Sequence, residues 1–145
     1  MPLISDFVRH DSKARLFVDK YDECPDVAAT ALFLAGNEPC FKSLAEIICH
    51  SLNELLDEIC VSDLSFVENE TGCPVNIRFE YGDQVLPLTD GTVIEAANGI
   101  VWTLTESEAS VVATSLHGLG YAFEHLHFNP TNKGMMAAFC FIENR

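Results

Sequence analysis

The stretch Asn98-Gly99-Ile100-Val101-Trp102-Thr103-Leu104-Thr105-Glu106-Ser107-Glu108 joins a turn, a strand and the start of a helix. Asn-Gly is the strongest short signal for a tight β-hairpin turn. The β-branched and aromatic residues of Ile100–Leu104 favour a strand. Thr105 and Glu108 have the spacing of a capping box, which marks the first turn of a helix. This junction of strand and helix predicts an α+β fold.

The segments around this junction show the periodicity of strands. Alternate residues of Val75–Tyr81 are apolar, as expected for a strand with one buried face. Gly82-Asp83 and Asp90-Gly91 are turn signals that separate neighbouring strands. We expect the central strands to form a small antiparallel β-meander, followed later in the chain by a C-terminal strand. The predicted strands lie at 75–81, 84–88, 92–97, 100–104 and 135–142.

Two long amphipathic helices are expected, one before and one after the central strands in the sequence. Apolar residues recur every three or four positions from Ser43 to Cys60, and again from Thr105 to about His127. Ser43 and Glu46 have the spacing of a capping box for the first helix. Each apolar stripe is predicted to pack against one face of the sheet.

The N-terminal third is predicted to be helical as well. Pro25 suits the first turn of a helix, and Gly36-Asn37 suits its end. The shorter helical segments are expected at 3–8, 16–21 and 28–34. The chain has 145 residues, 48 % of them hydrophobic, which is enough for one buried core. The sequence therefore predicts a single α+β domain over residues 1–145, with N-terminal helices, a small antiparallel β-meander, a long helix near 105–127 and a C-terminal strand.

The charge of the chain is concentrated in its middle. Between Lys42 and Lys133 one basic residue, Arg78, stands against fourteen acidic residues, a balance of −13 within a total of −14. A surface that cannot pair its own carboxylates repels itself and attracts basic partners. The same field disfavours binding to a phosphate backbone. We therefore expect a basic protein partner and no direct contact with nucleic acid.

The carboxylates expected to bind the partner fall into two groups. Turns carry recognition more often than strands, and none of these acids has a basic residue close by in the sequence. The first group, at the end of the first long helix and the start of the sheet, comprises Glu54, Asp57, Glu58 and Asp63. The second group, at the strand turns, comprises Glu68, Glu70, Asp83 and Asp90.

The sequence has no recognisable motif for catalysis or for binding a metal or cofactor, and we expect none of the three. The six cysteines contain no C-x-x-C pair and fit no zinc template, so reduced and mostly buried thiols are expected. His125 and His127 are two residues apart, unlike the pair in H-E-x-x-H. Cys49 and His50 are neighbours, so their side chains are expected to diverge on a helix and not to act together as nucleophile and base.

The sequence also bears on the compartment. Its start, Met1-Pro2-Leu3-Ile4-Ser5-Asp6, lacks the basic residues and long apolar run of a signal peptide. The apolar runs along the chain are too short to span a membrane. We expect a cytoplasmic protein that does not bind membranes.

The segment Ala97–Thr114 resembles one stretch of the ArdB/KlcA antirestriction proteins. That stretch has an Asn-Gly turn, four residues, Leu-Ser or Leu-Thr, and then an Ala-rich helix opening with a pair such as Val111-Val112. The family's Asn-Gly-Gly turn is not matched around Ser62–Gly72, and the family continues in helix where this chain has Asn129-Pro130. The resemblance implies a small acidic protein of a plasmid or phage that blunts a host DNA-defence system. It assigns no role to any single residue.

The leading interpretation is a non-enzymatic acidic inhibitor of a basic, nucleic-acid-handling protein. The cleft of such a target is built to hold phosphates, so clustered carboxylates fit it and speed association. An antirestriction protein and an immunity protein that neutralises a cognate nuclease toxin both belong to this class, and the sequence does not separate them. Two other classes stay open: a small enzyme with an unrecognised cysteine or carboxylate site, and a scaffold domain whose acidity only keeps it dissolved. The oligomeric state is open as well.

Overall fold

The computed structural model describes residues 3–20, 30–82, 91–120, 125–128 and 137–143. They form two mixed β-sheets and two α-helices, so the fold is α+β. The larger sheet has the order β4-β1-β2-β9-β8. Its strands are β4 (Val67–Asn69), β1 (Ala14–Lys20), β2 (Thr30–Gly36), β9 (Ala137–Ile142) and β8 (His125–Phe128). The smaller sheet has the order β3-β5-β7-β6. Its strands are β3 (Glu58–Cys60), β5 (Val75–Glu80), β7 (Gly99–Thr105) and β6 (Thr92–Ala96). The helices are α1 (Glu38–Asn53) and α2 (Glu106–His117), with short 3-10 helices η1 (Ile4–Phe7) and η2 (Val61–Asp63).

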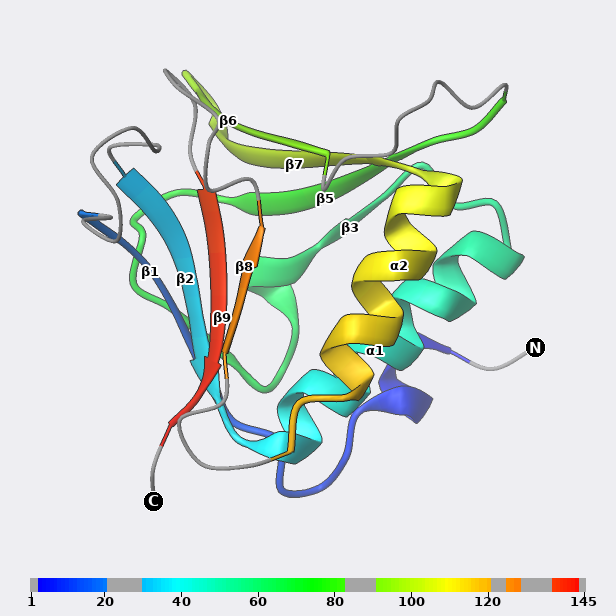
Figure 1. The fold of residues 1–145 in the computed structure, drawn as a ribbon, viewed down its shortest axis with the longest axis horizontal. Coiled ribbons are helices and arrows are strands. Elements are labelled where there is room, and N and C mark those ends of the chain that lie inside the picture. Colours follow the sequence, from blue (N-terminus) through cyan, green and yellow to red (C-terminus); the bar gives the residue numbers. More distant parts are fainter. Residues whose placement is uncertain (1–2, 21–29, 83–90, 121–124, 129–136, 144–145) are drawn as a thin grey trace.

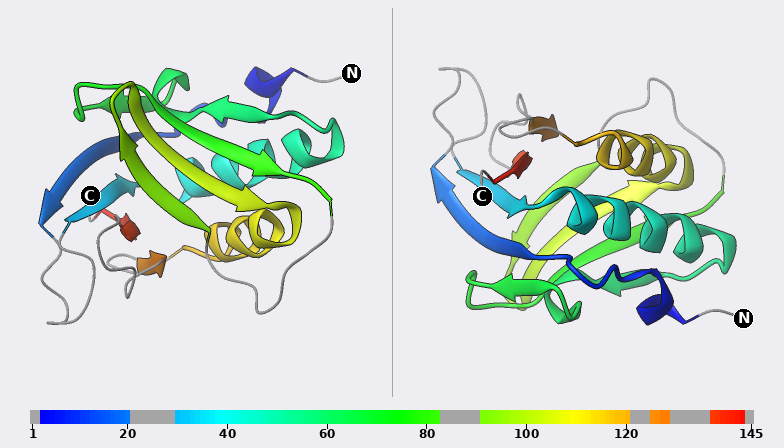
Figure 2. Two further views of the ribbon diagram at one scale, coloured as in Figure 1. Left: turned by 90° about the horizontal axis from the view of Figure 1, so that it is seen from above. Right: turned by 90° about the horizontal axis from the view of Figure 1, so that it is seen from below.

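The two sheets and the helix pair enclose a common core. Figure 1 shows the larger sheet on the left, the smaller sheet across the top and the two helices on the right. Seen from below, α1 and α2 lie side by side, and β2 leads directly into α1 (Figure 2, right). Buried side chains from both sheets and both helices form one hydrophobic cluster. Within it the rings of Trp102 in β7 and Phe128 in β8 lie 5.2 Å apart and connect the two sheets.

The helix predicted from Ser43 to Cys60 is present, but its boundaries were wrong. It begins after Asn37, whose Oδ1 accepts hydrogen bonds from the backbone N–H groups of Cys40 and Lys13, each at 3.2 Å. A Pro in the first turn is compatible with this start, because its missing N–H has no partner there. Ser43 is buried within α1 and its hydroxyl accepts a hydrogen bond from the Arg9 backbone N–H. The helix ends before Leu55, which adopts a φ of 53°.

Two of the predicted N-terminal helices are strands. The segments around 16–21 and 28–34 contribute to β1 and β2, which pair antiparallel along their length, while the segment 3–8 holds η1. Their apolar runs, Leu16–Val18 and Ala31–Leu34, are short and nearly continuous. Such a run does not by itself distinguish a buried strand from a buried helix. The pairing of β1 and β2 with each other and with β9 decides in favour of strands.

The antiparallel β-meander was also wrong, because the sheets are mixed. Pairing is parallel between β5 and β7, between β1 and β4, and between β2 and β9. The hairpin of β6 and β7 is confirmed, as is the C-terminal strand, β9. At the hairpin turn Gly99 has a φ of 142°, and a Cβ there would lie 2.4 Å from the carbonyl oxygen of Pro74. The strand predicted at 84–88 lies outside the described residues.

The capping box that starts α2 is confirmed, but the helix is shorter than predicted. The Thr105 N–H donates to Glu108 Oε1 at 3.0 Å, and the Glu108 N–H donates to Thr105 Oγ1 at 3.2 Å. α2 ends at His117, and Gly118 is its C-cap. Glycine lowers helix stability by roughly 1 kcal/mol relative to alanine, and Gly120 follows closely. The residues predicted to continue this helix as far as His127 include strand β8.

Two substitutions on α2 test how this helix is packed. Leu116 is fully buried, whereas Val111 is 52 % exposed. Replacing Leu116 by alanine should lower the free energy of unfolding by about 2–5 kcal/mol, because it leaves a cavity in the core. Replacing Val111 by alanine should change it by less than about 1 kcal/mol. Urea unfolding of both variants measures the difference, and equal effects would show that the buried face of α2 is misassigned.

Candidate functional site

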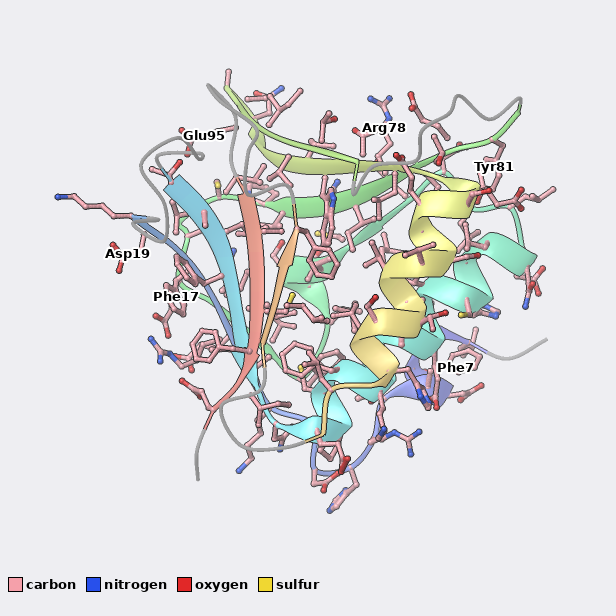
Figure 3. The ribbon with its side chains drawn as sticks, in the orientation of Figure 1. Phe7, Phe17, Asp19, Arg78, Tyr81 and Glu95 are labelled. Atoms are coloured by element: carbon pink, nitrogen blue, oxygen red, sulfur yellow. The ribbon has the colours of Figure 1, made fainter. Side chains whose placement is uncertain are left out.

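Three elements meet where α1 ends, β5 ends and α2 begins. Tyr81 follows β5 and lies close to the start of α2 (Figure 3). Its hydroxyl donates a 2.6 Å hydrogen bond to the backbone carbonyl of Leu56, just beyond α1. Burial raises the pKa of Tyr81, and the negative charges of Glu106 and Asp57 raise it further. Both carboxylates therefore lie near the same phenol ring.

We call Glu54, Asp57 and Glu106 the acidic end. Glu54 is the C-cap residue of α1, and Asp57 follows three residues later. The C-terminus of a helix carries a partial negative charge, so carboxylates there are unfavourable, whereas Glu106 is in the favourable first turn of α2. Within the described part of the chain none of these three carboxylates takes part in an ion pair. The acidic end thus gathers carboxylates that have no basic side-chain partner among the described residues.

The other two members of the first predicted group lie apart from this site. Glu58 is on β3, where its carboxylate accepts a 3.0 Å hydrogen bond from Asn76 Nδ2 and its Cα is paired with that of Arg78. Asp63 is exposed in η2, beyond the far end of β3. Only Glu54 and Asp57 of this group belong to the acidic end, which also includes Glu106, a residue that the sequence did not single out.

The described part of the second group lies beside a basic residue. Arg15 Nε is 3.0 Å from Glu70 Oε2, and Arg15 Nη1 is 2.9 Å from Glu143 Oε1. Glu68 is on β4, with its Cα paired to that of Arg15. The sequence offered no signal for this neutralisation, because Arg15 is 55 positions from Glu70. Asp83 and Asp90 lie outside the described residues.

A groove of about 590 Å³ runs between α1 and α2 on their outer side, with η1 at one edge. We call it the interhelical groove. The Phe7 and His50 rings meet at one wall with their centroids 4.9 Å apart. Its other polar lining includes Glu46, Cys49, Glu54 and His117. A neighbouring depression shares Cys49 and Asn53 with it and extends to Glu106, so the groove opens toward the acidic end.

Cys49 and His50, which are neighbours on α1, both border the interhelical groove, and His117 of α2 borders it as well. No hydrogen bond joins the Cys49 thiol to either ring in the described part of the structure. Burial, followed by the charge of Glu46, raises the pKa of Cys49. The thiolate, which is the nucleophilic form, is therefore disfavoured.

The remaining residues considered for chemistry do not form a further site. Cys40 and Cys140 are buried, and burial raises the pKa of Cys140 to about 12. Among the described residues no three His, Cys, Asp or Glu side chains are placed to hold a metal ion. The Cys24 thiol and the rings of His125 and His127 are not described. None of the described helices is long and apolar enough to cross a membrane.

Comparison of the chain with protein-family models, with curated proteins and with solved structures gave no match. The resemblance of Ala97–Thr114 to the ArdB/KlcA proteins therefore stays a prediction from the sequence.

The environment of Tyr81 can be tested by its ionisation. Its folded-state pKa is raised, so its contribution to stability is present below the pKa of an unfolded tyrosine, about 10, and is lost as the pH rises through the folded-state value. Asp57→Asn combined with Glu106→Gln should lower this pKa only partly, because burial is the largest cause. NMR of the labelled tyrosine ring measures the shift. An unchanged pKa would mean that these carboxylates do not face the phenol.

Proposed function

We propose that this protein is a non-enzymatic inhibitor that binds a basic, nucleic-acid-handling protein through the acidic end, and that it counteracts a bacterial DNA-defence system. Nucleases and their associated subunits hold phosphates with arginine and lysine side chains. Carboxylates presented at similar positions satisfy the same donors. Complementary charge also accelerates the encounter of the two proteins.

The contrast between the C-terminal ends of the two helices carries this proposal. α2 ends beside Lys42, whose Nζ donates a 2.9 Å hydrogen bond to the carbonyl oxygen of His117. A cation is the stabilising group at such a position. α1 ends at Asn53 and is followed by Glu54, its C-cap residue, and by Asp57, while the His50 ring of its last turn packs against Phe7. The end of α1 therefore favours a basic group supplied by another molecule.

Two other classes receive less support from the described residues. A cysteine enzyme needs a thiolate or a base bonded to the thiol, and Cys49 has a raised pKa and no such bond among the described residues. An acidity that only prevents aggregation needs no particular location. Here two carboxylates from separate parts of the chain, Asp57 after α1 and Glu106 in the first turn of α2, lie close enough to Tyr81 to raise its pKa. The resemblance to the antirestriction proteins agrees with the inhibitor.

A phage challenge tests the proposed function. Cells with a DNA restriction system are infected with unmodified phage, with and without this protein. The protein should raise the efficiency of plating, and the double variant Asp57→Lys and Glu106→Gln should abolish the gain, because it reverses or removes two charges of the acidic end. The matched variant Glu95→Lys and Asp63→Asn changes the net charge equally, at exposed positions on β6 and η2. It should retain the gain.

The same pair of variants identifies the physical cause. Circular dichroism and urea unfolding establish that each variant folds, so that a loss of activity can be assigned to charge. Binding to the captured target should weaken as salt is raised, because exposed charges are screened. No gain in plating, or an equal loss with both variants, would contradict an inhibitor that acts through the acidic end.

A further inference from the structure

The interhelical groove has an open carboxylate at one end and an occupied one at the other. Glu46 and Glu54 both line it and are two helical turns apart on α1. The Arg9 guanidinium forms a hydrogen-bonded ion pair with Glu46, and the Arg9 backbone N–H is held by Ser43 Oγ at 2.9 Å. Glu54 has no ion pair within the described part of the chain. Arg9 thus pairs with one of the two carboxylates that line the groove, Glu46, and leaves Glu54 open to a basic group of another molecule.

The surface between these carboxylates suits a flat cation. The Phe7 and His50 rings, 4.9 Å apart, form one wall, and Ala45 and Ala113 are small enough to leave room between the helices. An arginine side chain combines an apolar stem with a planar guanidinium that stacks on rings and binds a carboxylate with two donors. A lysine ammonium is more strongly hydrated and forms a point contact. The groove therefore favours arginine over lysine.

We propose that the interhelical groove binds an arginine side chain of the partner, with the guanidinium on Glu54 and the stem between the two helices. This inference rests on the proposed function, since it names which residue of the basic partner is bound beside the acidic end. Arg9 on Glu46 shows the same chemistry within the chain. The groove adds selectivity for arginine to the attraction that the acidic end exerts on any basic surface.

Cys49 provides a direct probe of the groove. It lines the groove and its residue is exposed, whereas Cys40 and Cys140 are buried. In the free protein iodoacetamide should alkylate Cys49 while the two buried thiols stay unmodified. The Cys49→Ser variant gives the background from all other cysteines. A ligand seated in the groove covers the thiol and slows its alkylation.

The test compares short peptides that differ in one side chain, namely arginine, lysine or the uncharged citrulline. At a peptide concentration ten times Kd, the arginine peptide should slow the alkylation of Cys49 about tenfold, because only the free fraction reacts. The lysine peptide should protect less at the same concentration, and the citrulline peptide should not protect. Equal protection by the citrulline peptide, or none by the arginine peptide, overturns the inference.

Two variants separate this inference from the proposed function. Glu54→Gln should remove the preference for arginine over citrulline, whereas Glu95→Gln, an exposed acid on β6, should leave it unchanged. Asp57→Lys, which alters the acidic end outside the groove, should keep the protection by the arginine peptide. If the captured target binds while Cys49 reacts at its free rate, the proposed function stands and the groove inference fails. If the arginine peptide protects Cys49 but no target is inhibited, the reverse holds.

Discussion

The antiparallel packing of α1 against α2 is the interaction on which the rest of the structure depends. Ile47 and Ile48 of α1 and Val112 and Leu116 of α2 are each fully buried. α2 also contacts β7 and β5, while α1 continues directly from β2, so the helix pair joins the two sheets. Both helices are fixed at their starts by side-chain caps, Asn37 for α1 and Thr105 for α2. Separating the helices would expose the core to water on one whole side.

The candidate functional features follow from the same packing. Because the helices are antiparallel, the C-terminal end of α1 lies beside the N-terminal end of α2, which brings Asp57 and Glu106 to Tyr81. At the opposite end Lys42 of α1 reaches the last carbonyl of α2. The interhelical groove is the outer side of this contact, where small residues face each other. The packing of the two helices thus places Lys42 at the C-terminal end of α2 and the acidic end at the other end of the pair. It also forms the interhelical groove, which opens toward the acidic end.

The sequence could predict features that depend on a few neighbouring residues. The capping box of Thr105 and Glu108, the Asn-Gly hairpin and the alternation along β5 were all confirmed. The sequence could not predict features that depend on distant residues. The sequences of β1 and β2 are compatible with short helices, and the pairing of these segments with each other and with β9 makes them strands. Glu70 has no basic residue near it in the sequence, but the pairing of β4 with β1 brings it to Arg15. The sequence could not predict that Glu106 belongs to the acidic end either, because Tyr81 and Asp57, which lie near it in the fold, are far from it in the sequence.

The central claim is that the carboxylates that follow α1, through which we propose that the partner is bound, oppose folding. Urea unfolding of the double variant Glu54→Gln and Asp57→Asn, at low and at high salt, tests it most directly. The account predicts that the variant is more stable than the unmodified protein by up to about 1 kcal/mol at low salt, because neutral side chains no longer oppose the helix dipole, and that salt reduces the gain. A variant of equal or lower stability at low salt would contradict the claim, because the two carboxylates would then not be opposing the fold.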